Sequence, residues 1–205
     1  MSFEKYIAKN KDGRALENPP RRKCLNAVVI PAYAEMESLP RTLESLSRNP
    51  QALLDDSAVV LVVNNPPAAS ADPAGLEENS RMLESLRNSQ FPCQDRLNLH
   101  WIDASGDGRG INPKEGVGAA RKLGMDMALE HLDFDRGSPL MISLDADTIV
   151  EGNYLESINA FFKDHPKTAG ASISFAHQPG ATPEEDAAIT RYELFMRYYV
   201  IAASS

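Results

Sequence analysis

Short apolar runs rich in β-branched residues alternate along the chain with longer segments in which apolar residues recur at helical spacing. The first kind of run predicts buried strands, which cover residues 27–31, 58–63, 97–102, 140–144 and 169–175. The second kind predicts helices, which cover residues 38–48, 73–88, 118–132, 153–163 and 183–203. Strands that alternate with helices form βαβ units. The pattern therefore predicts an α/β fold, a Rossmann-type sandwich with a mainly parallel central sheet and helices on both faces.

The two ends of the chain stand apart from this alternation. Residues 1–23 are polar and mixed in charge, so we expect a polar N-terminal arm there. The remaining residues, 24–205, have the length of a single domain. They finish inside an apolar helical stretch, 198–202, so we expect the C-terminal half of that domain to be short or missing.

The last predicted helix has a strong start and an apolar end. Thr182 stands at the N-cap position and is followed by Pro183 and three acidic residues. The apolar end carries Phe195, Met196, Tyr199 and Ile201. An apolar surface of this kind predicts contact with a partner, and a homodimer through this helix is one outcome.

Charge and cysteine content exclude several classes of protein. The net charge is −8 and the pI is about 5.0, which argues against a general nucleic-acid binder. The two cysteines share no motif spacing, which argues against a disulfide framework or a zinc site. The sequence shows no leader-like apolar region in residues 1–23 and no run of about 18 apolar residues. We therefore expect a cytoplasmic protein.

Ligands of parallel α/β sheets bind beyond the carboxyl ends of the strands, so the residues that follow each strand are read for function. Pro31, Tyr33 and Glu35 follow the first predicted strand, and Tyr33 is either a platform for a nucleobase or a ring packed at the rim of the sheet. Asn64 follows the second strand, where its carboxamide either pairs with a base edge or serves a turn.

The strongest local motif is an Asp-Ala-Asp triplet after the fourth predicted strand. Asp145 and Asp147 bring two carboxylates to the same edge of the sheet. Such oxygens suit a divalent cation that also holds substrate phosphates, and the cation would neutralise charge on a leaving diphosphate. The alternative is an ordinary turn before the next helix.

Arg121 lies in the first turns of a predicted helix that opens with glycines. This arrangement suits a phosphate or nucleotide, and the alternative is a surface arginine. The preceding glycine-rich stretch, 103–115, has neither a helix directly after its glycines nor a glutamate at the last position of a calcium loop. We interpret that stretch as a loop over the ligand.

Five segments in this order resemble the family 2 glycosyltransferases, which have the GT-A nucleotide-sugar fold. They are VVIPAYAE at 28–35, LPRTLESL at 39–46, VVNN at 62–65, GVGAARKLGMDMAL at 116–129 and SLDADT at 143–148. The resemblance implies Mn²⁺ or Mg²⁺ as cofactor and a nucleoside-diphosphate sugar as donor. It extends from residue 27 to about residue 175, which is most of the chain.

The resemblance also implies roles for individual residues. Pro31, Tyr33 and Glu35 match the first stretch that contacts the nucleotide, and Arg121 matches the arginine beside it. Asn64 matches the position that reads the base, which is usually an aspartate, so the choice of base stays open. Of the D-x-D pair, Asp147 is expected to bind the metal directly, and Asp145 to face the ribose or the metal.

The function that follows is a metal-dependent, inverting glycosyltransferase with UDP-sugars as the leading donors and an unknown glycan, lipid or small molecule as acceptor. Inverting members use a carboxylate base well downstream of the D-x-D pair. The acidic residues at 184–186 are better explained by the start of a helix, so no catalytic base is named. The alternative is a nucleotide-sugar-binding module without turnover. A nucleotidyltransferase is disfavoured because residues 31–38 contain neither glycine nor lysine.

Overall fold

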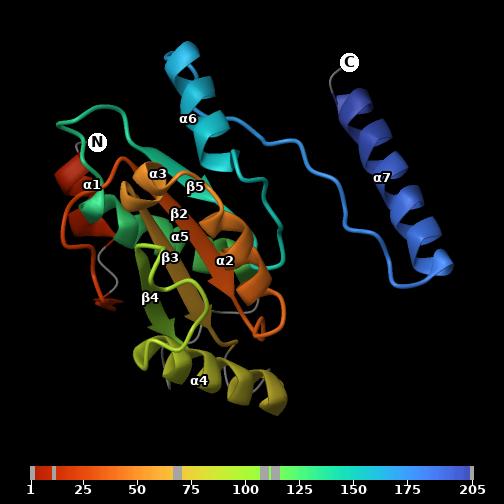
Figure 1. Cartoon of the computed structure of the whole chain (residues 1–205), viewed down its shortest axis with the longest axis horizontal. Helices are drawn as coiled ribbons and strands as arrows, with labels where there is room; N and C mark the ends of the chain where they lie inside the picture. Colours follow the sequence, from red (N-terminus) through yellow and green to blue (C-terminus); the bar gives the residue numbers. More distant parts are fainter. Residues whose placement is uncertain (1–2, 11–12, 67–70, 107–110, 112–115, 204–205) are drawn as a thin grey trace. The chain divides into compact units, whose positions relative to one another are not determined.

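The computed structural model describes residues 3–10, 13–66, 71–106, 111 and 116–203. The chain divides into two compact units, Met1–Asp164 and His165–Ser205, and each is described by itself. The first unit holds a five-stranded sheet in the order β1-β4-β3-β2-β5. Its strands are β1 (Leu16–Glu17), β2 (Asn26–Ala32), β3 (Ser57–Asn64), β4 (Leu99–Ala104) and β5 (Leu140–Ser143). All neighbouring pairs are parallel except β1 and β4 (Figure 1).

Helices cover both faces of this sheet. The helical elements of the first unit are α1 (Phe3–Lys9), α2 (Leu39–Ser47), α3 (Gln51–Asp55), α4 (Pro73–Arg87), α5 (Gly116–Ala128), the 3-10 turn η2 (Leu129–His131) and α6 (Tyr154–Asp164). Leucines of α2 and α4 pack on one face, against alternate residues of β2 and β3, and α5 packs on the other. The predicted α/β fold is therefore confirmed. The helices that the structure describes are each too short or too polar to span a membrane.

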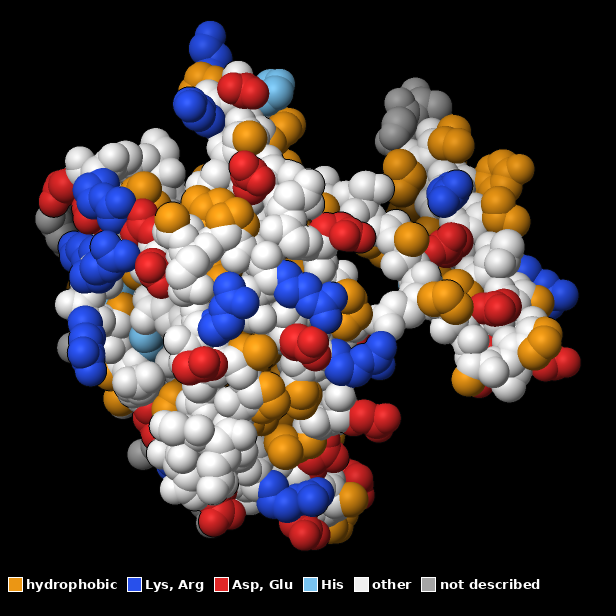
Figure 2. All heavy atoms as spheres, viewed as in Figure 1, with side chains coloured by type: hydrophobic (Ala, Val, Ile, Leu, Met, Phe, Trp, Pro, Cys, Tyr) orange, Lys and Arg blue, Asp and Glu red, His pale blue; other side chains and the backbone are white. Residues whose placement is uncertain are grey.

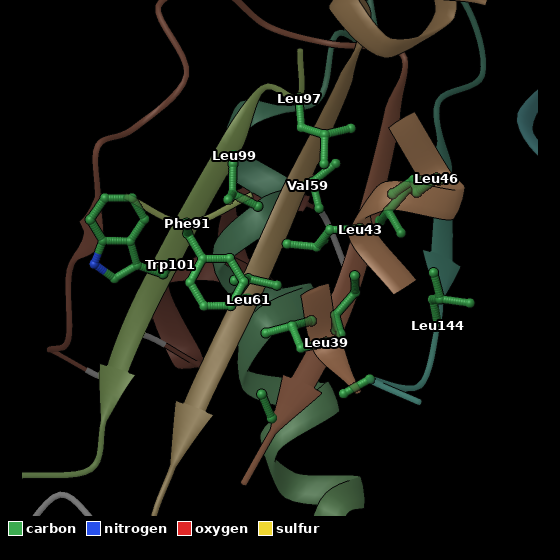
Figure 3. Packing of buried hydrophobic residues seen from close by; sticks show 14 of the residues in the cluster. Leu39, Leu43, Leu46, Val59, Leu61, Phe91, Leu97, Leu99, Trp101 and Leu144 are labelled. Atoms are coloured by element: carbon green, nitrogen blue, oxygen red, sulfur yellow. The ribbon is translucent and has the colours of Figure 1, made fainter. Parts of the chain in front are cut away.

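The larger core cluster explains why α2 forms where it does. Leu39, Leu43 and Leu46 recur at helical spacing and are fully buried. Figure 3 shows them in the same cluster as Val59 and Leu61, which lie on this face of β3. Strands β2 and β3 are buried on both faces, which is why the sequence presents them as continuous apolar runs.

Two residues within the predicted N-terminal arm over 1–23 belong to the sheet of the first unit. Leu16 pairs with Ile102 and Glu17 with Trp101, so β1 extends the sheet beyond β4. The Arg87 guanidinium donates hydrogen bonds to both Glu17 carboxylate oxygens at 3.0 and 2.7 Å. A two-residue strand has no periodicity of its own, so only its pairing reveals it.

The predicted strand at 169–175 is wrong. None of these residues belongs to a strand, and all of them are exposed. The run AGASISF contains only two large apolar residues, Ile173 and Phe175, and strand structure requires a partner ladder that no described residue of the second unit supplies. The two compact units divide after Asp164, and the single domain over 24–205 stays a prediction.

The second unit contains α7 (Pro183–Ala203), which begins as predicted. The Glu185 amide donates to Oγ1 of Thr182 at 3.2 Å, and Glu185 Oε2 accepts from the Ala181 amide at 2.6 Å. Asp186 Oδ1 accepts from the Gly180 amide at 2.7 Å. The Thr182 hydroxyl caps the helix, and Glu185 and Asp186 accept amides of the two residues before it, so two of the acidic residues at 184–186 serve the helix start.

Figure 2 shows hydrophobic side chains gathered along the surface of α7. Of the residues predicted to meet a partner, Phe195, Tyr199 and Ile201 are exposed, whereas Met196 is half-buried. A homodimer through this helix stays a prediction, which a measurement of molecular mass in solution would test.

The only described ionisable side chain with a strongly lowered pKa is a buried histidine on β4. His100 is 2% exposed, and its Nδ1 lies against the carbonyl oxygen of Asn18. Nδ1–H therefore donates to that carbonyl, and Nε2 is left buried with no partner among the described residues. Burial lowers the pKa of His100 to about 4.

We expect the unfolding free energy to fall by about 2 kcal/mol more in the wild type than in His100→Asn between pH 7 and pH 5. The unfolded chain takes up a proton on this histidine near its ordinary pKa of about 6.5, whereas the folded chain does so only near 4. Acidification therefore favours the unfolded state. Urea unfolding followed by the fluorescence of Trp101, the single tryptophan, measures this difference. Equal losses in both proteins would contradict it, and the exposed His165→Asn serves as control.

Candidate functional site

The order of the strands places a topological switch point at the carboxyl ends of β2 and β5. From β2 the chain continues to β3 and β4 on one side and then returns to β5 on the other side. The two strands stay in register up to Val29 and Ser143, and the Leu144 amide donates to the Val29 carbonyl at 3.1 Å. The segments that follow β2 and β5 therefore leave the sheet next to each other, where α/β proteins bind ligands.

Both carboxylates of the D-x-D motif lie on the exposed side of the segment after β5. Leu144 and Ala146 are buried, whereas Asp145 and Asp147 are exposed. The Arg121 guanidinium reaches over from α5 and forms an ion pair with Asp145 through Nη2 and Oδ1. The structure thus brings together two of the predicted site residues from segments more than 20 positions apart.

Buried polar side chains on and just beyond α2 hold this segment in place, and they were not among the predicted site residues. Thr42 Oγ1 donates to the Ala146 carbonyl at 2.7 Å, and Ser45 Oγ accepts from the Val150 amide at 3.0 Å. Just beyond the helix, Asn49 Oδ1 accepts from the Leu155 amide at 2.8 Å. The sequence contains a pattern that could have indicated them. Polar residues at 42, 45 and 49 recur at helical spacing beside the leucines that face the core.

The segment after β2 has an unusual backbone. Ala34 has a φ of +57°, in the left-handed region that costs an alanine about 1–2 kcal/mol. The Ser38 hydroxyl donates to the Glu35 carboxylate. Tyr33 is half-buried, and Pro31 is buried within β2 opposite Val62. Of the three predicted nucleotide contacts, Tyr33 and Glu35 therefore lie beyond the strand end, whereas Pro31 lies inside the sheet.

Asn64 is the last residue of β3 and is half-buried. Its carbonyl accepts a hydrogen bond from Nδ2 of Asn79 at 3.0 Å, and its carboxamide has no partner among the described residues. The Asn64 side chain is thus available to a ligand, whereas the adjacent Asn65 has its amide engaged with the Ser105 carbonyl at 2.8 Å. Of the stretch predicted to cover the ligand, residues 107–110 and 112–115 lie outside the described residues.

The acidic residues fit a metal that is shared with a ligand. Within the described part of the chain, no group of three or more His, Cys, Asp or Glu side chains could hold an ion by itself. Mg²⁺ and Mn²⁺ are commonly held by one or two carboxylates together with substrate phosphates and water. Two exposed carboxylates, Asp145 and Asp147, match that donor set, and the cation on Arg121 adds charge for an anion.

Two hollows among the described residues include basic side chains in their lining. One, of about 370 Å³, runs along α5 and includes Arg121, Lys122 and Tyr6 in its lining. The other, of about 560 Å³, lies at the opposite edge of the sheet and includes Arg22, Arg96 and His100. Neither Asp145 nor Asp147 lines these two hollows, although Arg121, the partner of Asp145, lines the first.

No known protein-family model matches the chain, and neither does any curated protein. Among solved structures the chain is similar to S. aureus TarS. For TarS 1–349 the identity is 20%, the match covers 77% of this chain and 41% of that chain, and the TM-score is 0.43. For TarS 1–349 in complex with UDP-GlcNAc the corresponding values are 18%, 74%, 37% and 0.41. For its complex with UDP they are 18%, 74%, 38% and 0.42.

This chain thus spans about two-fifths of the length of those solved chains.

Proposed function

We propose that this chain is the donor-binding part of a metal-dependent, inverting glycosyltransferase that uses a nucleoside-diphosphate sugar, with UDP-sugars as the leading donors. The acceptor would be a glycan, a lipid or a small molecule. The observation that carries the proposal is the pairing of Arg121 with Asp145 at the switch point of the sheet. A cation and two exposed carboxylates next to a strand end suit a diphosphate and a divalent metal.

The proposal divides the site into two sides. On the diphosphate side, Asp145 and Asp147 would hold Mn²⁺ or Mg²⁺, which when bound neutralises negative charge on the leaving diphosphate. Arg121 would bind a phosphate oxygen once Asp145 turns to the metal. On the nucleoside side, Tyr33 offers a ring face for the base, and the unengaged carboxamide of Asn64 offers hydrogen bonds to its edge.

The general base for the acceptor is not among the residues assigned here. Glu185 Oε2 and Asp186 Oδ1 accept backbone amides at the start of α7, so both carboxylates serve the helix. A nucleotide-sugar-binding module without turnover is therefore the second candidate. Release of free sugar from a UDP-sugar by the isolated chain would favour the transferase, and tight binding without release would favour the module.

We expect thermal melting with UDP, GDP, CDP and dTDP to show a rise in Tm with one of them, and only when Mn²⁺ is present. A ligand at about 100 times its Kd adds about 2.7 kcal/mol, which corresponds to about 5 °C or more for a chain of this length. EDTA should abolish the shift, and the matching nucleoside, which lacks phosphates, should give none. Absence of a shift with all four nucleotides would refute the proposed donor site.

A further inference from the structure

We infer that one face of α4, formed by Gly75, Glu78 and Asn79, positions the nucleoside side of the candidate site. The inference rests on the proposed function and goes beyond it by assigning residues outside the D-x-D and strand-end motifs. Glu78 and Asn79 follow Gly75 by three and four positions, so both lie on the face of the helix that Gly75 occupies. Each of them contacts the segment after β2, and we assign them as positioning residues because that segment, rather than α4, would meet the ligand.

Asn79 is fully buried and joins two strand ends through a single carboxamide. Its Oδ1 accepts from the Ala34 amide at 3.0 Å, and its Nδ2 donates to the Asn64 carbonyl at 3.0 Å. The orientation of the carboxamide is dictated by these partners, because an amide N–H only donates and a carbonyl only accepts. The Ala34 amide belongs to the residue with the left-handed backbone, so Asn79 stabilises the conformation that follows Tyr33.

The Asn79 carboxamide also belongs to a chain of hydrogen bonds that crosses the carboxyl ends of the strands. Asn79 Nδ2 also donates to Oδ1 of Asn65 at 2.7 Å, and Nδ2 of Asn65 donates to the Ser105 carbonyl at 2.8 Å. The carboxyl ends of β2, β3 and β4 are thereby linked through two side chains. Tyr33 and Asn64, the two candidate nucleoside contacts, are held relative to each other by this network.

Gly75 and Glu78 complete the face. A β-carbon on Gly75 would lie 2.7 Å from the Tyr33 hydroxyl oxygen and 3.0 Å from Cζ, so the tyrosine ring reaches its place only because this residue is glycine. Glu78 Oε1 accepts from the Met36 amide at 2.7 Å. Helix α4 thus positions both the ring of Tyr33 and the backbone at Met36.

The diphosphate side has a separate support. Thr42 on α2 holds the Ala146 carbonyl, and Arg121 on α5 pairs with Asp145. No described hydrogen bond joins α4 to residues 144–150. A change on the α4 face should therefore weaken binding of the nucleoside and leave binding of the diphosphate and metal intact.

The test compares the affinity for UDP with that for inorganic pyrophosphate, both with Mn²⁺, in the full chain. In Gly75→Ala the new methyl group displaces Tyr33, and in Asn79→Asp both donated hydrogen bonds are lost. We expect each variant to bind UDP about tenfold more weakly and to bind pyrophosphate within about twofold of the wild type. The matched controls are Gly137→Ala, whose β-carbon meets nothing within 4 Å, and the exposed Asn88→Asp at the end of α4.

Parallel losses for UDP and pyrophosphate, or unchanged UDP affinity in both variants, would overturn the inference. Hydrogen exchange of the peptide spanning residues 33–38 gives a readout without ligand, and we expect faster exchange in Asn79→Asp than in Asn88→Asp. If the wild type binds no nucleoside diphosphate, the proposed function fails and the nucleoside role falls with it. Faster exchange of residues 33–38 in Asn79→Asp would still show that α4 supports the segment after β2. Unchanged exchange would overturn that structural role too.

Discussion

Replacing Asp147 by alanine is expected to lower Mn²⁺-dependent binding of the preferred nucleoside diphosphate by at least about 100-fold. A site with only two protein carboxylates loses half of its charged ligands in this variant. Because Asp147 is exposed, the unfolding free energy should change by no more than about 0.5 kcal/mol. Isothermal titration with and without Mn²⁺, together with urea unfolding, measures both quantities.

Asp145→Asn refines this test. The amide oxygen still accepts a hydrogen bond from Arg121, but the negative charge that attracts the metal is gone. We expect a smaller loss of affinity than in Asp147→Ala, again confined to the metal-dependent part. Asp135→Ala removes an exposed carboxylate elsewhere on the first unit and serves as control. Metal-dependent affinity that survives unchanged in both site variants would remove Asp145 and Asp147 from the site.

The largest effect on stability is expected for Gly124→Ala, at a cost of about 3 kcal/mol. Gly124 lies where α5 crosses the sheet, and a β-carbon there would lie 2.4 Å from Cγ1 of Val29 and 2.7 Å from Cγ2 of Val62. Both contacts are β-branched side chains of fully buried strands, which cannot turn away without leaving their rotamers. Chemical unfolding followed by Trp101 fluorescence should show the loss, with a fall in Tm of about 8 °C.

Gly118→Ala on the same helix is the matched variant. Its β-carbon meets nothing within 4 Å, so the alanine should only reduce the freedom of the unfolded chain. We expect it to raise stability by about 0.5–1 kcal/mol. If Gly124→Ala were to stabilise the protein as Gly118→Ala does, the close approach of α5 to β2 and β3 would be refuted.

Elements that are deeply buried, or that begin with strong local signals, could be predicted from the sequence with nearly correct bounds. The apolar runs at 27–31 and 58–63 became β2 and β3, because strands covered on both faces need apolar residues at every position. Helix α7 was predicted over the residues it occupies, since its cap, proline and acidic first turn are local signals. The short β1 and α3 were not predicted, because two or five residues carry no measurable period.

Some residues of the candidate site could also be predicted from the sequence, and others could not. Asp145, Asp147 and Arg121 were identified by residue type and by position after a strand or at a helix start. Asn79, which links the strand ends, was not identified. A single asparagine within a helix has no local feature that distinguishes a buried bridge from a solvated side chain, and only the packing of α4 against the ends of β2 and β3 makes it one.

The sequence by itself determined the alternation of strands and helices and the chemistry at the strand ends, because both depend on residue type and spacing over short distances. The tertiary structure alone decided that 169–175 forms no strand, that Leu16 and Glu17 do, and that Arg121 pairs with Asp145. Strand pairing, ion pairs and buried amide bridges join residues far apart in the chain. Which residues pair in these interactions depends on the folded geometry, and no local sequence pattern predicts it.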